Sequence, residues 1–364
     1  RCATAGTPQE GPPQGNRPYN AYIGPYLIPI LYDIQYLLIF IPFLYGLVTP
    51  SPTYGVSGLP QASFFEERHA IFQKGLFLSK IMIFCIFVVG FDILLGFTGY
   101  LSFGHAAFFG ISAYVTGIML KSFSDNIIPA IIVAVAAATL VALIIGLLTL
   151  KRTGIYFSIL TLAFAEMFDS MAMSMLQRWT GGENGLTGMP TPMLFDLKMQ
   201  GDTVFYFCAI CAIILFYLAK RIERSPVGLM MKAIKCNQTR LEYTGINARK
   251  YKLLAFVLSA MYAAIAGALM VVYEPFVGHE FLGWHQSGEV VIMSVIGGVG
   301  TLVGPMLGAA FMLYFENVMS VDLGEQWLLV LGVIFMAVVI FMPGGFMEAI
   351  ARLKKRFFTT IDGE

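Results

Sequence analysis

Several carboxylates lie within or beside strongly apolar segments, where an ionisable side chain is costly and is therefore a candidate for function. They are Asp33, Asp92, Glu166, Asp169, Glu289 and Glu316. Most of them lie near the end of a segment, where helix capping or an interfacial position explains a carboxylate as simply as proton transfer does. Asp92 is expected to lie deepest in its segment, and it is the carboxylate that we single out.

Other patterns that could support catalysis or metal binding have simpler explanations. Ser102, His105 and Asp92 are close enough in sequence to form a nucleophile and its base, but residues that break and pack helices explain them as well. Cys208 and Cys211 lie inside an apolar segment, with no Cys or His partners at zinc-site spacing. No GxxxxGK[ST], HExxH or GxSxG motif occurs. We therefore expect no catalytic, cofactor-binding or metal site in this chain.

The composition places the chain in a membrane. Hydrophobic residues make up 57% of it and charged residues only 12%, whereas a soluble domain carries roughly 25% charged residues. The apolar runs are continuous rather than alternating, which favours helices over a barrel. The predicted fold class is all-α, a polytopic integral membrane protein with about eight full transmembrane helices plus broken or re-entrant helices. A net charge of +1 gives no indication of a nucleic-acid partner.

Three parts are predicted along the chain. Residues 1–25 are rich in Pro, Gly and Gln and are expected to be disordered, without a signal peptide. Residues 26–348 form the transmembrane domain, whose first span is expected within Tyr26–Leu47, and residues 349–364 form a basic tail.

Two stretches interrupt the apolar pattern with closely spaced glycines. Residues 96–104 read GFTGYLSFG and residues 297–304 read GGVGTLVG, so both contain Gly-x-x-Gly followed by another glycine. Broken helices at matching positions of two halves indicate a transport path. Glycine packing between helices, or a surface loop before a tilted helix, is the alternative. The predicted path residues are Gly96, Gly99, Ser102, Gly104, His105, Gly297, Gly298, Gly300 and Gly304.

A short basic loop, residues 221–252, separates two apolar segments and predicts the cytoplasmic side there. The basic tail is placed on the same side. The stretch 289–319 is then predicted to be a hairpin that enters from outside and returns, with each limb shorter than a span and its glycine tip at mid-membrane.

Part of the basic loop is expected to be an amphipathic helix. Apolar residues recur there at helical spacing: Val227, Leu229, Met230, Ala233 and Ile234. Such a helix either rests on lipid headgroups or docks a cytoplasmic partner. The chain thus reads as a transporter or channel subunit. A carrier coupled to ions would show more buried charges, so a permease driven by separate ATPases fits better, while a self-contained carrier or channel stays open.

The motifs of residues 76–347 resemble, in register, those of LivM-type permeases of branched-chain amino-acid ABC importers. The matching stretches are GFTGYLSFGHAAFFGISAYVTG, TLAFAEM, TGGENGLTGMP, RSPVGLMMKAIKCNQTRLEYTGIN, KLLAFVLSAMYAAIAGAL and VIGGVGTLVGPMLGAAF. The resemblance implies a second, LivH-like permease, two cytoplasmic ATPases that hold ATP and Mg, and an external or periplasmic solute-binding protein. It also implies the bacterial inner membrane, with the basic loop and the C-terminus in the cytoplasm.

The resemblance gives the basic loop the role of coupling to the ATPases. The implied coupling residues are Ala233, Asn237, Gln238, Arg240, Glu242, Gly245 and Asn247. The family usually has Glu where this chain has Gln238, and Ala where it has Leu241. The implied substrates are branched-chain or other small amino acids, with urea, short amides or organic and aromatic acids as the second choice.

Overall fold

The computed structural model describes residues 62–349 and 352, with gaps at 196 and 343. The chain divides into two units, 1–59 and 60–364, and everything described belongs to the second. The expected disordered segment 1–25, the span expected within Tyr26–Leu47 and nearly all of the basic tail lie outside the described residues.

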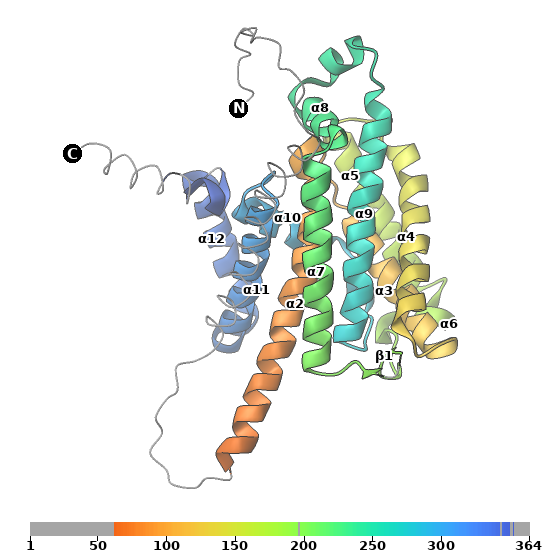
Figure 1. Ribbon diagram of the computed structural model, residues 1–364, viewed down its shortest axis with the longest axis vertical. Coiled ribbons are helices and arrows are strands. Elements are labelled where there is room, and N and C mark those ends of the chain that lie inside the picture. Colours follow the sequence, from red (N-terminus) through yellow and green to blue (C-terminus); the bar gives the residue numbers. More distant parts are fainter. Residues whose placement is uncertain (1–61, 196, 343, 350–351, 353–364) are drawn as a thin grey trace, which may run out of the picture. The chain divides into compact units, whose positions relative to one another are not determined.

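Helices dominate this part of the chain (Figure 1). In order, the α-helices are α2 (Ala62–Thr98), α3 (His105–Ser122), α4 (Ile127–Thr149), α5 (Ile155–Met173), α6 (Gln177–Thr180), α7 (Asp202–Glu223), α8 (Pro226–Tyr243), α9 (Ala248–Tyr273), α10 (Trp284–Gly297), α11 (Val303–Leu323) and α12 (Trp327–Phe341). Single 3-10 turns are η2 (Gly182–Asn184), η3 (His279–Phe281) and η4 (Gly324–Gln326). Strands β1 (Met193–Leu194) and β2 (Leu197–Lys198) pair antiparallel, with Met193 opposite Lys198.

The all-α, multi-pass class is confirmed, but the count of about eight full spans is not. Five helices in the described ranges are long and apolar enough to cross a membrane: Leu76–Thr98, Ile127–Thr149, Ile155–Met173, Asp202–Glu223 and Ala248–Tyr273. The other apolar helices are not among these five. Helix α3 has 18 residues, most of them buried, and α10 and α12 have 14 and 15.

Helix α9 is the centre of the packing and contacts α2, α3 and α4. Its buried face is built mainly from alanine, with Gly267 where α3 comes nearest. A Cβ at Gly267 would lie 2.1 Å from the carbonyl oxygen of Phe109, so only glycine allows this approach. Small residues at helix contacts are how membrane helices pack closely without large side chains between them.

Helix α4 shows the outer layer. Its buried residues include alanines at every fourth position, namely Ala130, Ala134, Ala138 and Ala142. Its large side chains, such as Ile132, Leu140 and Ile144, are exposed. A helix that is apolar all round but buries mostly small residues presents most of its large ones to lipid or to a partner subunit.

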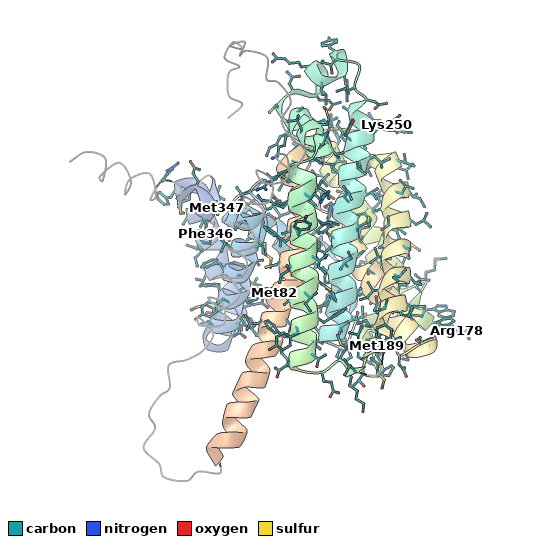
Figure 2. All side chains as sticks on the ribbon, viewed as in Figure 1. Met82, Arg178, Met189, Lys250, Phe346 and Met347 are labelled. Carbon is teal, nitrogen blue, oxygen red and sulfur yellow. The ribbon has the colours of Figure 1, made fainter. Side chains whose placement is uncertain are left out.

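The basic loop of the sequence can be located on the helix bundle. Figure 2 shows Lys250, at the start of α9, near α8 at one end, and Arg178, in α6, at the opposite end. The basic loop of the sequence therefore lies at a single end of the bundle, which we call the α8 end.

Candidate functional site: the α8 end of the bundle

The first glycine break separates α2 from α3. Helix α2 ends at Thr98, α3 begins at His105, and Gly99 has φ +78°. Ser102 is buried, and its hydroxyl accepts a hydrogen bond from Gly104 N at 3.3 Å. Of the path residues predicted here, Gly99, Ser102 and Gly104 lie in this non-helical segment, whereas Gly96 lies in the last turn of α2 and His105 begins α3.

His105 is buried at the start of α3 and does not form a catalytic pair with Ser102. Its Nε2 lies 2.7 Å from the hydroxyl oxygen of Ser259 on α9, and its ring meets the rings of Phe91, Phe108 and Phe256 edge to face. Asp92 binds neither of these residues but the amides of Gly300 and Leu302. The three side chains bind different groups, so their arrangement does not support a catalytic nucleophile with its base.

The second glycine break separates α10 from α11. Gly298 has φ +114° and Gly300 has φ +88°, which L-residues adopt only with strain. A Cβ on Gly297 would lie 1.9 Å from the carbonyl oxygen of Gly304, so the two helices meet on glycine. With 21 residues, α11 is longer than the short limb that the sequence predicted.

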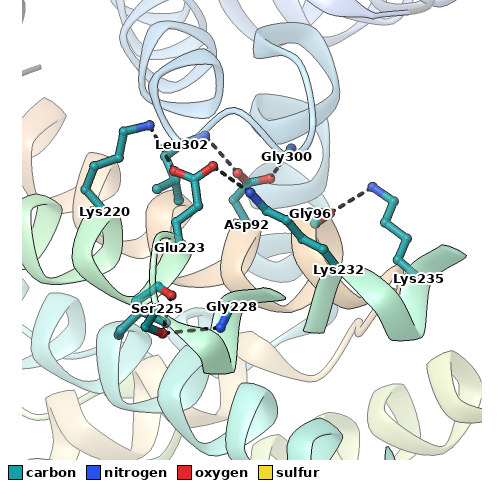
Figure 3. A network of polar contacts seen from close by, with 11 residues as sticks. Asp92, Gly96, Lys220, Glu223, Ser225, Gly228, Lys232, Lys235, Gly300 and Leu302 are labelled. Atoms are coloured by element: carbon teal, nitrogen blue, oxygen red, sulfur yellow. Dashed lines mark hydrogen bonds and ion pairs between the residues drawn. The ribbon is translucent and has the colours of Figure 1, made fainter. Parts of the chain in front are cut away.

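Asp92 joins the two breaks (Figure 3). Its side chain is 0% exposed, and its two carboxylate oxygens accept hydrogen bonds from Gly300 N at 2.7 Å and Leu302 N at 3.0 Å. A Cβ on Gly96 would lie 2.8 Å from the Cα of Gly300. Asp92 therefore holds the tip of the α10–α11 hairpin against the last turns of α2, by binding amides that precede α11.

The hairpin tip does not lie where the sequence placed it. Its loop packs against the last turns of α2, and α8 contacts the same turns. The tip is therefore at the α8 end of the bundle and not at its middle. The hairpin is shifted because α10 starts inside the bundle, where Ser287 Oγ accepts a hydrogen bond from Ala106 N at 2.9 Å.

Two lysines of α8 reach the first break. Lys235 Nζ donates a hydrogen bond of 2.8 Å to the carbonyl oxygen of Gly96, and Lys232 Nζ lies 5.1 Å from the centre of the Phe97 ring. Glu223, at the end of α7, accepts hydrogen bonds of 2.9 Å from both Lys220 and Lys232. These contacts tie α7, α8 and the end of α2 into one polar network.

The expected amphipathic helix is present as α8. Ser225 is its N-cap and accepts a hydrogen bond from Gly228 N at 3.3 Å, with Pro226 as the first helical residue. Of its apolar residues, Met231 and Ile234 are buried while Leu229 is exposed. The predicted coupling residue Ala233 packs beside a small cluster of Ile234, Leu241 and Ala248.

The helix is kinked at Asn237, which the sequence analysis missed. Asn237 has φ −163° and ψ 101°, and its side-chain oxygen accepts a hydrogen bond from Arg240 N at 3.0 Å. This is an N-cap within the helix, so residues 238–243 form a separate short turn of helix. Gly245 follows with φ +83°, and Asn247 caps α9 through Arg249 N at 3.1 Å.

A second group of hydrogen bonds lies beneath this short turn. Lys252 of α9 is 3% exposed, and its Nζ donates to the hydroxyl of Tyr100 and, at 2.6 Å, to Gln238 Oε1. Gln238 Nε2 donates to Glu242 Oε1 at 2.8 Å. Burial, and then the Glu242 carboxylate, raises the pKa of Tyr100 above its ordinary value of 10.0, so its hydroxyl remains neutral.

The predicted residues therefore fall into two groups. Gly96, Gly297, Gly298, Gly300 and Gly304 come together at the hairpin tip, whereas Gly104 packs farther along, where its Cβ would lie 2.4 Å from the Thr161 carbonyl oxygen of α5. The predicted coupling residues Arg240, Glu242, Gly245 and Asn247 are exposed around the kinked end of α8. In this structure the breaks are closed, packed joints beneath an exposed helical tip.

Comparison with known proteins gives a family and several relatives. Residues 75–339 match the family described as "Branched-chain amino acid transport system / permease component". The chain is 26% identical over 290 residues to the high-affinity branched-chain amino acid transport system permease protein LivM of Escherichia coli K12, covering 73% of this chain and 68% of that one. No solved structure matches.

More distant relatives carry other names. The corresponding LivH protein of Salmonella typhimurium is 22% identical over 285 residues, covering 72% of this chain and 91% of LivH. The autoinducer 2 import system permease protein LsrC of Enterobacter sp. strain 638 is 23% identical over 187 residues, covering 48% of this chain and 52% of LsrC.

Proposed function

The chain belongs to the permease components of branched-chain amino acid transport systems, and we propose that it forms part of the path by which an ABC importer takes up branched-chain or other small amino acids. It is a permease subunit of an importer and a multi-pass membrane protein. ATP and Mg would be held by separate ATPase subunits. We place the importer in the bacterial inner membrane, with the α8 end and the C-terminus in the cytoplasm, because basic loops favour that side.

The proposed substrate is supported by the names of the relatives. LivM and LivH are both described as acting in branched-chain amino acid transport, and both match more than two thirds of this chain. LsrC belongs to an import system for another molecule and matches less of it. Urea, short amides and organic acids stay the competing substrates of the same machinery.

The proposed partners follow from the same relatives. The chain is similar to both LivM and LivH, which supports a pair of homologous permeases in one complex. Large apolar side chains are exposed on α4, α5 and α7, so these helices offer faces for lipid or for such a partner. Two cytoplasmic ATPases and an external solute-binding protein complete the proposed importer.

One observation carries the proposed coupling: the base of the exposed α8 tip is hydrogen-bonded to the first glycine break, which Asp92 joins to the second. Lys235 holds the carbonyl of Gly96, and Asp92 in the same turns of α2 holds Gly300. An ATPase that moved residues 238–245 would therefore pull on the first break directly and on the second through Asp92. The packed joints would open or close together, which is what switching between outward-open and inward-open states needs.

The test is a mild-detergent pull-down of the full chain from its native membrane, followed by mass spectrometry and reconstitution in liposomes. Recovery of two P-loop ATPases and a second permease, with leucine uptake that requires ATP, supports the proposal. Uptake that follows an ion gradient or simple diffusion, by a chain that binds no ATPase, would make it a carrier or channel. Competition of leucine uptake by urea, acetamide and benzoate would decide between the substrate classes.

A further inference from the structure

A second polar cluster lies where α5 meets η3 and the start of α10. Asp169 Oδ1 on α5 lies 3.2 Å from Nδ1 of His279 in η3. One turn earlier on α5, Glu166 Oε1 accepts a hydrogen bond of 3.3 Å from Trp284 N, the first residue of α10. Two carboxylates thus face the segment that leads into the hairpin.

Glu166 is the unusual member of this cluster, because it lies within an apolar helix long enough to span a membrane, about two turns before that helix ends at Met173. Asp92, which the sequence singled out as the deepest carboxylate, is fully buried and lies at a similar distance from the end of its own span. No lysine, arginine or histidine pairs with Glu166 in the part of the chain that the structure describes. A carboxylate at such a position requires water or a cation beside it.

Tyr114 of α3 supplies an independent observation. The residue is 5% exposed, and its hydroxyl has no hydrogen-bond partner within the described ranges. Phe168, the residue before Asp169 on α5, packs against the same buried cluster that contains Tyr114, so Tyr114 lies next to this part of α5. A buried hydroxyl without a partner is costly, and a ligand that enters beside Asp169 would remove that cost.

The walls around these polar groups are apolar. The Tyr114 ring belongs to a buried cluster with Leu186, Val277 and Leu282, and Phe168 and Phe281 pack against it. Carboxylates that lack a full set of partners would attract an ammonium group, and the neighbouring aliphatic and aromatic side chains suit an aliphatic chain.

The cluster is also connected to the coupling site. Helix α10 begins at Trp284, whose amide binds Glu166, and it ends at the second glycine break, whose loop is bound by Asp92. On the other side, α5 packs against the first break at Gly104. A movement of the two breaks would therefore shift α10 and α5, the two elements that carry the cluster.

We propose that Glu166, Asp169, His279 and Tyr114 form the site that binds the ammonium group of the transported amino acid. This inference rests on the proposed function and deepens it, because urea, amides and organic acids carry no such cation. The carboxylate oxygens and the Tyr114 hydroxyl oxygen accept the hydrogen bonds that the ammonium group donates, and the aliphatic chain lies against the apolar cluster.

The test measures ligand binding to the purified permease complex without its solute-binding protein, so that any binding measured is binding to the permease complex. The probes are leucine, 3-methylbutylamine, which keeps the ammonium group, and 4-methylpentanoate, which lacks it. Leucine and 3-methylbutylamine should bind and 4-methylpentanoate should not. Glu166→Gln and Asp169→Asn should each weaken leucine binding about tenfold or more, since each removes a charge-assisted bond.

The variants are chosen to keep the fold. Glutamine and asparagine retain an oxygen for Trp284 N and for His279, and Glu183→Gln, an exposed acid in η2, is the matched control that should bind leucine like the wild type. Tyr114→Phe should weaken leucine binding as well. A merely structural Tyr114 would instead leave binding unchanged and raise the melting temperature, because an unpaired hydroxyl is removed.

The outcomes separate this inference from the proposed function. If Glu166→Gln and Asp169→Asn complexes bind leucine and import it with wild-type KM, the ammonium site is wrong while the importer stands. Equal binding of 4-methylpentanoate and leucine would also overturn the site. Absence of ATP-driven uptake in the wild-type complex would contradict the proposed function itself.

Discussion

Lys235 of α8 donates a hydrogen bond of 2.8 Å to the main-chain carbonyl of Gly96, two residues before α2 ends. The donor lies in the basic loop and the acceptor lies in the first glycine break. Because the acceptor is a main-chain carbonyl, it is present whatever side chains α2 carries. The hydrogen bond therefore depends on the side chain of Lys235 alone. It is the most direct link between the exposed helical tip and the joint beneath it.

Replacing this lysine should weaken coupling more than folding. In Lys235→Met the carbonyl of Gly96 loses its charged donor, a loss of about 1 kcal/mol for a partly solvated bond. We expect the number of leucine molecules imported per ATP to fall about fivefold, while the amount of complex in the membrane stays the same. Lys250→Met is the matched control, because Lys250 is exposed and its ammonium makes no hydrogen bond in the described ranges. Unchanged import per ATP in Lys235→Met would contradict the link.

Asp92 should matter for both stability and transport. In Asp92→Ala the amides of Gly300 and Leu302 lose their acceptor in a buried site, at about 1–3 kcal/mol for each group. The melting temperature of the purified complex should fall, and uptake should fall with it. Asp92→Asn keeps one oxygen and turns an NH₂ group toward the other amide, so its effect should be intermediate. Wild-type stability of Asp92→Ala would mean that packing on Gly96 alone holds the breaks together.

Much of this arrangement could be predicted from the sequence, because it is encoded locally. Hydropathy predicted a polytopic helical membrane protein, and clustered glycines predicted the two breaks. Apolar spacing found α8. The kink at Asn237 had a signal as well, since asparagine in a polar helix competes for backbone amides and often caps a new turn.

The connections between segments had no such signal. Asp92 and Gly300 are 208 residues apart. The sequence around either residue does not predict that the Asp92 carboxylate binds the amide of Gly300. Helix α11 continues through Gly308, where a Cβ would lie 1.9 Å from the Met293 carbonyl oxygen. Gly308 therefore allows α11 to approach α10 closely and does not break the helix. This difference can be recognised only when the position of α10 is known. The position of the hairpin tip was wrong for the same reason, because it depends on where α10 starts inside the bundle.

Gly245 should be sensitive through its backbone. It has φ +83°, and nothing lies within 4 Å of a Cβ placed on it, so a side chain fits in space but is strained in conformation. Gly245→Pro and Gly245→Trp should abolish coupled transport while the subunit stays in the membrane. Gly245→Ala should cost about 1 kcal/mol and reduce uptake partly. Uptake is measured in proteoliposomes against the same amount of complex, and wild-type uptake by the Pro or Trp variant would exclude a coupling role.

Gly245→Asn separates the two causes of that sensitivity. Asparagine tolerates the left-handed conformation better than other L-residues. If strain alone is responsible, Asn should restore most of the uptake that Ala loses. If an ATPase surface packs closely on this glycine, Asn should be as harmful as Trp, and the ATPases should be lost from the purified complex.

Gln238 gives the last prediction, since it stands where the resembled family usually has Glu. Its oxygen accepts from Lys252 at 2.6 Å and its NH₂ group donates to Glu242 at 2.8 Å. Gln238→Glu would gain an ion pair with Lys252 but place two carboxylates side by side. The opposing effects should leave the stability of the complex within about 1 kcal/mol of the wild type.

Gln238→Leu should behave differently, because it removes an acceptor from a lysine that is 3% exposed. Lys252 would keep only the Tyr100 hydroxyl, and a buried ammonium with too few acceptors destabilises the fold by about 1–3 kcal/mol. The melting temperature of Gln238→Leu should therefore fall clearly below those of Gln238→Glu and the wild type. Equal melting temperatures for the two variants would show that Lys252 does not depend on Gln238, and that α8 is free to move without disturbing α9.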